Sequence, residues 1–303
     1  MEQPSSLQSI AAKPGTGEES SQGEPDGVPS PQNFESFYQE RKAQKFPTGD
    51  NPENDAVLQK ALRALNLSGG QVLMDFGCAD GYFTQKLARA VPGVRAIGID
   101  LVAHDSWRDY RSENVTFVSG ELPTPLMPGS VDAIFCSQVL EHVPDPLGVA
   151  TEFCRVLKPG GRVWLATPNS YDDTARIFHA HQRRVDEIEG HLCHFGARDI
   201  ERLFGPLGFE CTAIRYDTFV ALWLYYRFVA YSPLKARLMP FVAPEIAVRA
   251  GMQAAEPHAQ QASGLKLAAR AVAFSLMRAA RSFDDLFGAS KYGQVIEVTL
   301  TKK

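Results

Sequence analysis

The chain has 303 residues, of which 44% are hydrophobic and 22% charged, a composition typical of a globular protein with a substantial core. Its formal net charge of −4 is carried by residues 1–33, which hold five acidic residues against Lys13, so the rest of the chain is formally neutral. A neutral body disfavours nucleic acid as an obligatory partner. The five cysteines include no C-x-x-C pair, which favours reduced thiols over a disulfide framework or a zinc site.

The N-terminal segment is rich in Ser, Gly, Pro, Gln and Glu and contains few large apolar side chains. Such a segment buries too little surface to offset the entropy of ordering, so we predict a disordered acidic tail over residues 1–33. No basic stretch leads into an apolar one, so we expect no secretory signal and a cytoplasmic protein. Residues 34–66 are predicted to form an N-terminal helical cap, in which ENDAVLQKALRALNL has amphipathic spacing and the following SGG ends the helix.

Beyond this cap, short apolar runs alternate with helical stretches. The predicted strands are VLMDF, RAIGID, NVTFVSG, VDAIFCS, RVWLAT and ECTAIRY, and the predicted helices cover residues 82–90, 146–157 and 197–207. This alternation predicts an α/β fold with a doubly wound, mostly parallel sheet and helices on both faces. A last strand, GQVIEVTLTKK, completes a predicted core of residues 67–218 and 291–303.

The first strand runs into a turn of small residues, GCADG, and then into a helix. Gly77 permits a tight turn, Ala79 leaves room for a ligand near the backbone, and Gly81 allows close helix packing. By itself the turn is equally compatible with an ordinary strand-to-helix connection. Asp100 ends the second strand, where an acid can bind both ribose hydroxyls, and Glu121 ends the third, where it can meet an adenine edge. The acids at successive strand ends therefore favour a nucleotide-like cofactor.

Four segments in order, VLMDFGCADG, GID, DAIFCSQVLEHVPDP and RVLKPGGRVWLATPN, resemble the Rossmann-like class I S-adenosylmethionine-dependent methyltransferases, especially the branch that contains quinone-biosynthesis and other small-molecule enzymes. The resemblance covers roughly residues 55–218 and the last strand. It implies a seven-stranded sheet whose last strand is antiparallel, with S-adenosylmethionine as the cofactor. A nicotinamide enzyme would share the turn and the acid, but the Lys-Pro-Gly-Gly segment belongs to the methyltransferase pattern.

The resemblance also implies which residues bind the cofactor: Asp75, Gly77, Ala79, Gly81, Asp100, Leu101, Glu121, Leu122, Ser137 and Gln138. The first four would face its methionine part, and the next two its ribose and adenine. Glu121 and Leu122 would lie at the adenine edge, and the last two would line the sulfonium and the acceptor. The family has glycine at position 79, and the single methyl group of alanine is a mild change.

Histidine is suited by its pKa to take a proton from a hydroxyl acceptor. We consider His142 in LEHVPDP, and His191 and His194 in GHLCHF, as catalytic or acceptor-contacting residues, with a structural role as the alternative for each. Small-RNA 2′-O-methyltransferases hold a divalent ion with Glu-x-x-Glu-His and a distant histidine, but here Gln138 replaces the first carboxylate. We therefore expect no metal, the alternative being an ion held by Glu141, His142 and His191 or His194.

Residues 219–290 do not fit the alternation and are predicted to form a helical insertion with a net charge of +4, a lid or acceptor subdomain. Its apolar run FVALWLYYRFVAY is too short to span a bilayer. Helical spacing places the basic Lys266, Arg270, Arg278 and Arg281 opposite an apolar face made of Leu265, Val272, Leu276, Phe283, Leu286 and Phe287. This apolar face either packs on the core or on residues 219–231, or serves a hydrophobic or lipid-linked acceptor and touches an anionic membrane surface.

The sequence therefore predicts a cytoplasmic S-adenosylmethionine-dependent methyltransferase, with membrane association through residues 219–290 left open. Its acceptor is expected to be a small or lipid-like molecule, methylated at oxygen in preference to other atoms. Two alternatives stay open. One is a methyltransferase-like binding or scaffold protein without turnover, because a fold does not fix an activity. The other is an RNA methyltransferase, which the neutral body and the missing carboxylate disfavour.

Overall fold

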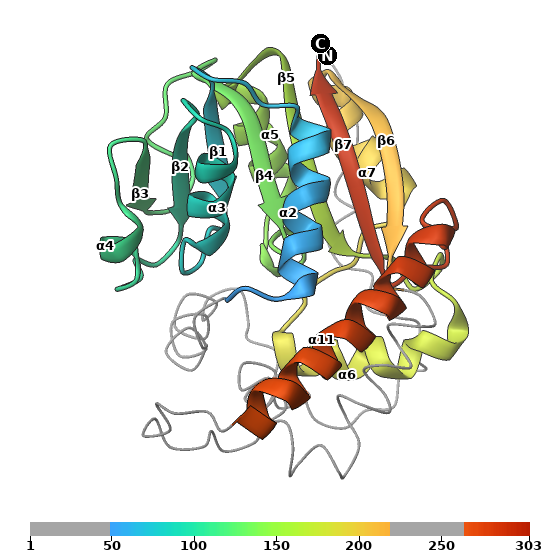
Figure 1. Cartoon of the computed structure of the whole chain (residues 1–303). Helices are drawn as coiled ribbons and strands as arrows, with labels where there is room; N and C mark the ends of the chain where they lie inside the picture. Colours follow the sequence, from blue (N-terminus) through green and yellow to red (C-terminus); the bar gives the residue numbers. More distant parts are fainter. Residues whose placement is uncertain (1–48, 219–263) are drawn as a thin grey trace, which may run out of the picture.

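The computed structural model describes residues 49–218 and 264–303, which build a seven-stranded sheet in the order β3-β2-β1-β4-β5-β7-β6 (Figure 1). The strands are β1 (Val72–Phe76), β2 (Arg95–Asp100), β3 (Val115–Ser119), β4 (Val131–Ser137), β5 (Leu157–Pro168), β6 (Phe209–Asp217) and β7 (Val295–Lys302). Only β7 runs antiparallel to its neighbours β5 and β6, and the other adjacent pairs are parallel. The predicted fold class, including the antiparallel last strand, is confirmed.

Helices cover both faces of the sheet (Figure 1). The helices of residues 49–218 and 264–303 are α2 (Pro52–Leu65), α3 (Tyr82–Ala90), α4 (Trp107–Tyr110), α5 (Pro146–Val156), α6 (His179–Glu189), α7 (Ala197–Phe204) and α11 (Gly264–Asp284). Short 3-10 turns are η2 (Leu140–His142), η3 (Arg176–Phe178), η4 (Gly205–Leu207) and η6 (Asp285–Phe287). Side chains alternate between the faces along each strand, so neighbours on β4 enter different cores. Ile134 packs in the cluster with α5 and α7, whereas Phe135 packs in the cluster with α2 and α3.

Local capping explains where α2 begins and ends. The Asn51 side-chain oxygen accepts hydrogen bonds from the backbone N–H groups of Glu53 and Asn54, both at 2.9 Å, and Pro52 occupies the first helical position. The helix ends at Asn66, which adopts the left-handed conformation with φ 49°. The SGG segment was predicted to end this helix, so the observed end comes slightly earlier.

The order of the strands fixes where a ligand can bind. β1 has β2 on one side and β4 on the other. The chain therefore builds β2 and β3 on one side of β1 and then crosses to the opposite side, where it continues with β4. In open α/β sheets such a change of side opens a crevice at the carboxyl ends of the strands. The GCADG turn follows β1 and the η2 turn follows β4, so both lie at the carboxyl ends of these neighbouring strands, where such a crevice is expected.

A buried ion-pair network attaches α11 to the core. The Arg281 guanidinium pairs with Asp217 at the end of β6, and Lys60 of α2 bonds both Asp217 and Glu297 of β7 at 2.8 Å. Arg281 is buried, with only 5% of its surface exposed. Burial alone would raise the pKa of Asp217, but the charges of Arg281 and Lys60 outweigh it and lower that pKa. Arg281 of the predicted basic side therefore faces the core, whereas Arg278 is exposed.

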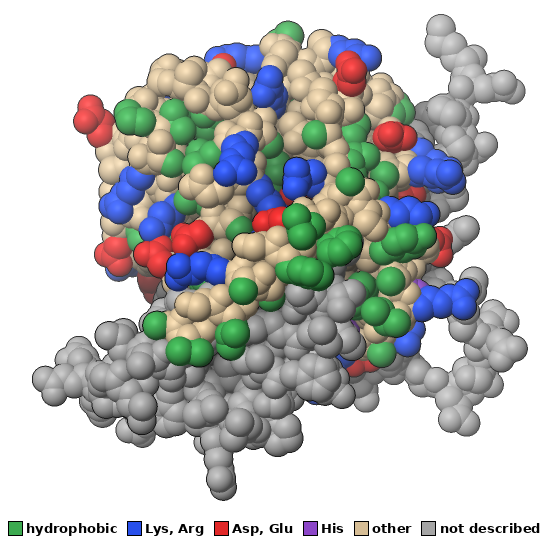
Figure 2. All heavy atoms as spheres, turned by 45° about the vertical axis from the view of Figure 1, so that its right-hand side comes forward, with side chains coloured by type: hydrophobic (Ala, Val, Ile, Leu, Met, Phe, Trp, Pro, Cys, Tyr) green, Lys and Arg blue, Asp and Glu red, His purple; other side chains and the backbone are tan. Residues whose placement is uncertain are grey.

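The predicted apolar face of the insertion can be followed over its C-terminal part. Exposed fractions on this surface are 60% for Val272, 52% for Leu276 and Phe283, 77% for Leu286 and 46% for Phe287, and Figure 2 shows hydrophobic side chains exposed on this side of the molecule. These five side chains therefore do not pack into the described core. Residues 219–263, and with them the FVALWLYYRFVAY run, lie outside the described residues. In the part of the chain that is described, no helix combines the length and the hydropathy needed to cross a bilayer.

Candidate functional site

The GCADG turn after β1 has a left-handed backbone at three positions, with φ 74° at Gly77, 46° at Ala79 and 86° at Gly81. A Cβ atom on Gly77 would lie 2.3 Å from the Val139 side chain, and one on Gly81 would lie 2.6 Å from the Phe117 ring. These two glycines are therefore required both by conformation and by close packing. Ala79 carries a Cβ in the same region, which costs about 1 kcal/mol.

The side chain of Asp100, at the end of β2, is hydrogen-bonded to the backbone of this turn. Its side chain is 4% exposed, and one carboxylate oxygen accepts a hydrogen bond from the Ala79 backbone N–H at 2.7 Å. The other oxygen accepts a longer hydrogen bond from the backbone N–H of Val102 at 3.3 Å. A carboxylate accepts several hydrogen bonds, from backbone N–H groups as here or from hydroxyl groups. The half-buried Leu101 follows directly.

Asp75 is oriented by a different contact from the one implied by the family resemblance. It is 2% exposed, and its carboxyl group accepts a hydrogen bond from the Thr84 hydroxyl of α3 at 2.5 Å. Burial raises the pKa of Asp75 to about 7, the neighbouring Asp100 and Asp80 act in the same direction, and the Thr84 hydrogen bond opposes them. Its expected approach to the methionine part of a cofactor stays a prediction.

The segment after β2 closes over the turn in a way that no sequence pattern indicated. The indole N–H of Trp107 donates to the Ala79 carbonyl at 2.8 Å, and the Ser106 hydroxyl donates to the Asp80 carbonyl at 2.8 Å. The Trp107 ring stacks on Phe117 of β3 with centroids 5.1 Å apart. These contacts of Trp107 fix the position of the GCADG turn. Nothing in the sequence around Trp107 distinguishes it from an ordinary core tryptophan.

The remaining predicted cofactor residues lie at two strand ends. Glu121 and Leu122 are exposed just after β3, where the Gly120 N–H donates to the Asp100 carbonyl at 3.0 Å. Ser137 ends β4, and Gln138 follows it with φ 55°, its N–H bonded to the Ala166 carbonyl at 2.8 Å. A non-glycine residue with this backbone stores strain, which is common at ligand sites.

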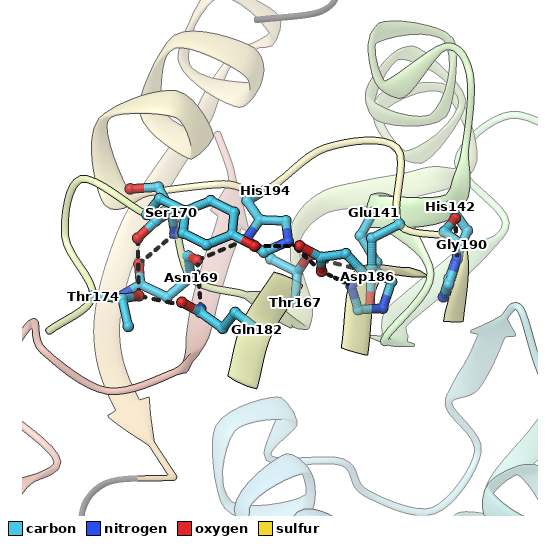
Figure 3. A network of polar contacts seen from close by, with 12 residues as sticks. Glu141, His142, Thr167, Asn169, Ser170, Thr174, Gln182, Asp186, Gly190 and His194 are labelled. Atoms are coloured by element: carbon cyan, nitrogen blue, oxygen red, sulfur yellow. Dashed lines mark hydrogen bonds and ion pairs between the residues drawn. The ribbon is translucent and has the colours of Figure 1, made fainter. Parts of the chain in front are cut away.

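The three histidines proposed from the sequence come together beside η2 (Figure 3). The ring centroids of His142 and His191 are 4.9 Å apart, and those of His191 and His194 are 5.8 Å apart. Asp186, near the end of α6, accepts hydrogen bonds through one carboxylate oxygen from His191 Nδ1 at 2.7 Å and from His194 Nε2 at 2.8 Å. Its other oxygen accepts a short hydrogen bond from the Tyr171 hydroxyl.

Charge compensation explains how this cluster is stabilised. Burial alone would raise the pKa of Asp186, but the hydrogen bonds from His191 and His194 outweigh it and hold that pKa well below its usual range. The ring of Tyr171 stacks on His194 with centroids 4.8 Å apart, and burial together with the Asp186 charge raises the pKa of its hydroxyl. Asp186 and Tyr171 were not among the residues singled out from the sequence.

Backbone contacts join the histidine cluster to the crevice. The Leu192 N–H donates to the Glu141 carbonyl at 2.8 Å, so the loop that carries His191 lies directly on η2. Glu141 is fully buried, and its carboxylate accepts a hydrogen bond from Thr167 of β5 at 3.0 Å. Val139, at the start of η2, packs against Gly77. The chain of contacts therefore runs from the GCADG turn through η2 to the loop after α6.

Two sets of metal-ligating groups overlap in this cluster. One ligand atom each from Glu141, His142 and His191 lie within 4.8 Å of one another, and so do those of Asp186, His191 and His194. Two histidines with one carboxylate are donors that suit a divalent transition metal. The first set contains the ligands considered in the sequence analysis, and whether an ion binds there stays untested. In the second set, the hydrogen bonds of His191 and His194 to Asp186 explain why the three ligand atoms lie close together.

Comparison with known proteins identifies similar chains. A family model described as a methyltransferase domain matches residues 49–214. The chain is 34% identical over 166 residues to a ubiquinone biosynthesis O-methyltransferase of Xanthomonas campestris pv. campestris, a match that covers 46% of this chain and 66% of that relative. It is 36% identical over 119 residues to the protein of the same name from Dechloromonas aromatica, which covers 35% of this chain and 48% of the relative. The chain thus spans less than two thirds of the length of these curated relatives.

A solved structure extends the comparison to the fold. Phosphoethanolamine N-methyltransferase 2 of Haemonchus contortus, in complex with S-adenosyl-L-methionine, matches with a TM-score of 0.51 at 18% identity. The match covers 82% of this chain and 52% of that chain. At this level of identity the likeness shows a shared fold.

Proposed function

Because the chain belongs to the family defined by this methyltransferase domain, we propose that it transfers the methyl group of S-adenosylmethionine to a hydroxyl oxygen of a small or lipid-like acceptor. The observation that supports this proposal is the arrangement of residues at the carboxyl ends of β1, β2 and β4. There, the GCADG turn bonded by Asp100 lies in a continuous chain of contacts with three histidines. In the proposed complex, the turn and Asp100 bind the nucleoside, and the histidines lie on the acceptor side.

The cofactor would lie across the carboxyl ends of β1, β2 and β4. Asp100 would bind the ribose hydroxyls through its carboxylate, with Leu101, Glu121 and Leu122 along the adenine. The GCADG turn would hold the methionine part, and Ser137 and Gln138 would line the sulfonium. A sulfonium methyl is transferred by in-line displacement, so much of the rate comes from holding the acceptor on its axis.

The names of the relatives support the proposed chemical class of the acceptor. They are named as O-methyltransferases of ubiquinone biosynthesis, and a quinone precursor that is methylated at oxygen must carry a hydroxyl group on its ring. We propose a phenolic acceptor of this kind, either free or attached to a lipid.

A membrane-bound acceptor would give the exposed apolar face of α11 and η6 a role. This face consists of Val272, Leu276, Phe283, Leu286 and Phe287, and the basic Arg278 of α11 is also exposed. An apolar face with a basic rim suits the surface of an anionic bilayer. Flotation with phosphatidylglycerol vesicles should recover the wild-type chain and lose Leu286→Glu, while Ser282→Glu at the end of α11 serves as the charge-matched control. Equal flotation of all three, or none, would remove this part of the proposal.

Two measurements test the main proposal. Calorimetry should detect binding of S-adenosylmethionine, and Asp100→Asn should weaken it about 10- to 100-fold because a charge-assisted hydrogen bond to the ribose is worth about 1.5–3 kcal/mol. Asparagine retains an oxygen for the Ala79 N–H, so the fold should persist. Asp105→Asn, whose side chain is 99% exposed, is the control. Absence of binding by the wild type would favour a scaffold protein instead.

Turnover is then measured with labelled S-adenosylmethionine and either catechol or a lipid extract, by counting the methylated product and S-adenosylhomocysteine. Product formation at the phenolic oxygen is expected. Cofactor binding without methylation of any phenolic acceptor would contradict the assigned acceptor class.

A further inference from the structure

We propose that Glu152 and Arg155 of α5 are positioning residues for the loop of residues 120–130 and that, through this loop, they set the preference of the cofactor site for adenine over other purine bases. The inference rests on the proposed placement of S-adenosylmethionine and deepens it, because it names the part of the cofactor that this loop recognises. It is carried by a set of hydrogen bonds that join the loop to α5.

The loop of residues 120–130 connects β3 to β4. Both strands belong to the parallel part of the sheet, so the chain must return here from the carboxyl edge of the sheet to its amino edge. It makes this return without forming a helix. Among residues 120–130, all of which the structure describes, Thr124 alone is buried. A loop that buries so little of itself depends on its neighbours for a fixed conformation.

Thr124 is held by a buried carboxylate. Oε1 of Glu152 accepts hydrogen bonds from the Thr124 N–H at 2.9 Å and from the Thr124 hydroxyl at 2.5 Å. Thr124 is 5% exposed and Glu152 is 4% exposed, so water competes little for these contacts. Burial alone would raise the pKa of Glu152, but the hydrogen bonds from Arg155 and Thr124 outweigh it and lower that pKa. The loop is therefore bonded to an ionised acceptor, which makes the hydrogen bonds stronger.

Arg155, one turn further along α5, binds the loop at two more positions. Its Nη1 donates to the Leu126 carbonyl at 2.8 Å, and its Nη2 donates to the Thr124 carbonyl at 3.1 Å. The same guanidinium donates to the Glu152 carboxylate through Nε at 2.7 Å and through Nη2 at 2.6 Å. Its planar set of donors thus fixes the distance between Glu152 and two loop carbonyls, which the single ammonium group of a lysine would not do.

The opposite end of the exposed part of the loop is bonded to the proposed cofactor edge of the sheet. The Gly120 N–H donates to the carbonyl of Asp100 at 3.0 Å, and the Asp100 side chain is proposed to bind the ribose. Glu121 and Leu122 are exposed and lie between this contact and Thr124. The two contacts therefore set the position of Glu121 and Leu122 relative to the proposed ribose site.

Adenine presents a distinctive edge to such a loop. Its exocyclic amino group donates a hydrogen bond and its ring nitrogen N1 accepts one, so a carboxylate can bind the first and a backbone N–H the second. Hypoxanthine has a carbonyl oxygen and a protonated N1 at the same positions, so both contacts are lost. The carboxylate of Glu121 and the N–H groups beside it can make this distinction only while the loop keeps its place, because a displacement of about 1 Å weakens such contacts strongly.

Calorimetry with S-adenosylhomocysteine and S-inosylhomocysteine measures this preference, because the two ligands differ only in the base. The wild type should bind the adenine ligand about 10- to 100-fold more tightly. Thr124→Val removes only the hydroxyl contact, and Arg155→Lys keeps a positive charge beside Glu152. Each should reduce the ratio of the two affinities about 3- to 10-fold, by weakening the adenine ligand and leaving S-inosylhomocysteine almost unchanged.

Matched surface substitutions serve as controls. Thr151 is exposed on the same helix, and the side chain of Arg108 is 85% exposed, so Thr151→Val and Arg108→Lys should keep the wild-type ratio. In the transfer assay with catechol, Thr124→Val and Arg155→Lys should raise the KM for S-adenosylmethionine and leave kcat at saturating cofactor unchanged. A general loss of structure would lower kcat as well.

A double-mutant cycle tests whether α5 acts through Glu121. Glu121→Ala should itself reduce the affinity ratio, and Thr124→Val should reduce it little further in that background. Fully additive losses would show that the contacts of α5 do not act through Glu121 and would refute this step.

Three calorimetric results would overturn the inference while leaving the cofactor assignment intact. They are equal weakening of both ligands by Thr124→Val and Arg155→Lys, an unchanged ratio in these variants, or a wild type that binds both ligands equally well. Hydrogen exchange needs no substitution: S-adenosylhomocysteine should protect residues 121–126 more than S-inosylhomocysteine does, and equal protection would contradict the inference. A wild type that binds neither ligand would instead refute the proposed function.

Discussion

Replacing Asp75 with asparagine is expected to stabilise the fold at neutral pH. Burial raises the pKa of this carboxyl group from 3.8 to about 7, so the folded protein keeps a proton on Asp75 where the unfolded chain has released it. Stability from this group is fully present at low pH and is lost as the pH rises from about 4 to about 7. At about 1.4 kcal/mol per pKa unit, the folded protein carries a penalty of about 4 kcal/mol above that range.

The assay is urea unfolding of the wild type and Asp75→Asn between about pH 4 and pH 8. Asparagine retains an oxygen for the Thr84 hydroxyl and carries no charge at any pH. The difference in unfolding free energy should be near zero at the acidic end and approach about 4 kcal/mol in favour of the variant at the alkaline end. Asp105→Asn, 99% exposed, should show no such trend. A difference for Asp75→Asn that does not change with pH would refute this reasoning.

Three further predictions concern the turn and α11. Ala79→Gly should raise the unfolding free energy by about 1 kcal/mol in urea titration, because it relieves a left-handed alanine. Gly77→Ala should be more destabilising than Gly70→Ala and should also weaken cofactor binding in calorimetry, because both have positive φ but only position 77 meets a side chain within 4 Å. Arg281→Met should lower the unfolding free energy by about 3 kcal/mol because it leaves a buried carboxylate short of a cation, whereas the exposed Arg278→Met should change it little.

The cofactor side of the site could be anticipated because parallel strands bring their carboxyl ends to one edge. Once VLMDF, AIGID and NVTFV are recognised as neighbouring strands, Gly77, Asp100 and Glu121 must lie at the same edge of the sheet. The observed hydrogen bond between the Asp100 carboxylate and the Ala79 N–H is a consequence of this placement. The orientation of Asp75 toward Thr84 was not anticipated, because a residue at a strand end can turn toward the adjacent helix as easily as toward the crevice.

The role of α11 could be anticipated only in part. Helical spacing predicts an apolar side and a basic side, but it does not say which residues are buried. The burial of Arg281 depends on Asp217, a residue far away in the sequence that pairs with Arg281 in the folded chain and is also bonded by Lys60. This buried ion pair turns Arg281 inward, whereas Arg278 and the apolar Val272, Leu276 and Phe283 are exposed.

The acceptor side depends on contacts that sequence spacing cannot reveal. Asp186 and His191 are close in the chain, but they meet only because Gly190 adopts a left-handed backbone that reverses the chain at the end of α6. His142 joins them because η2 binds the same loop through the Leu192 N–H. A change in this loop can therefore alter the histidine cluster while the strand-end residues stay the same. This separation explains why the sequence motifs indicate the cofactor, whereas the acceptor has to be established by measuring which hydroxyl compound is methylated.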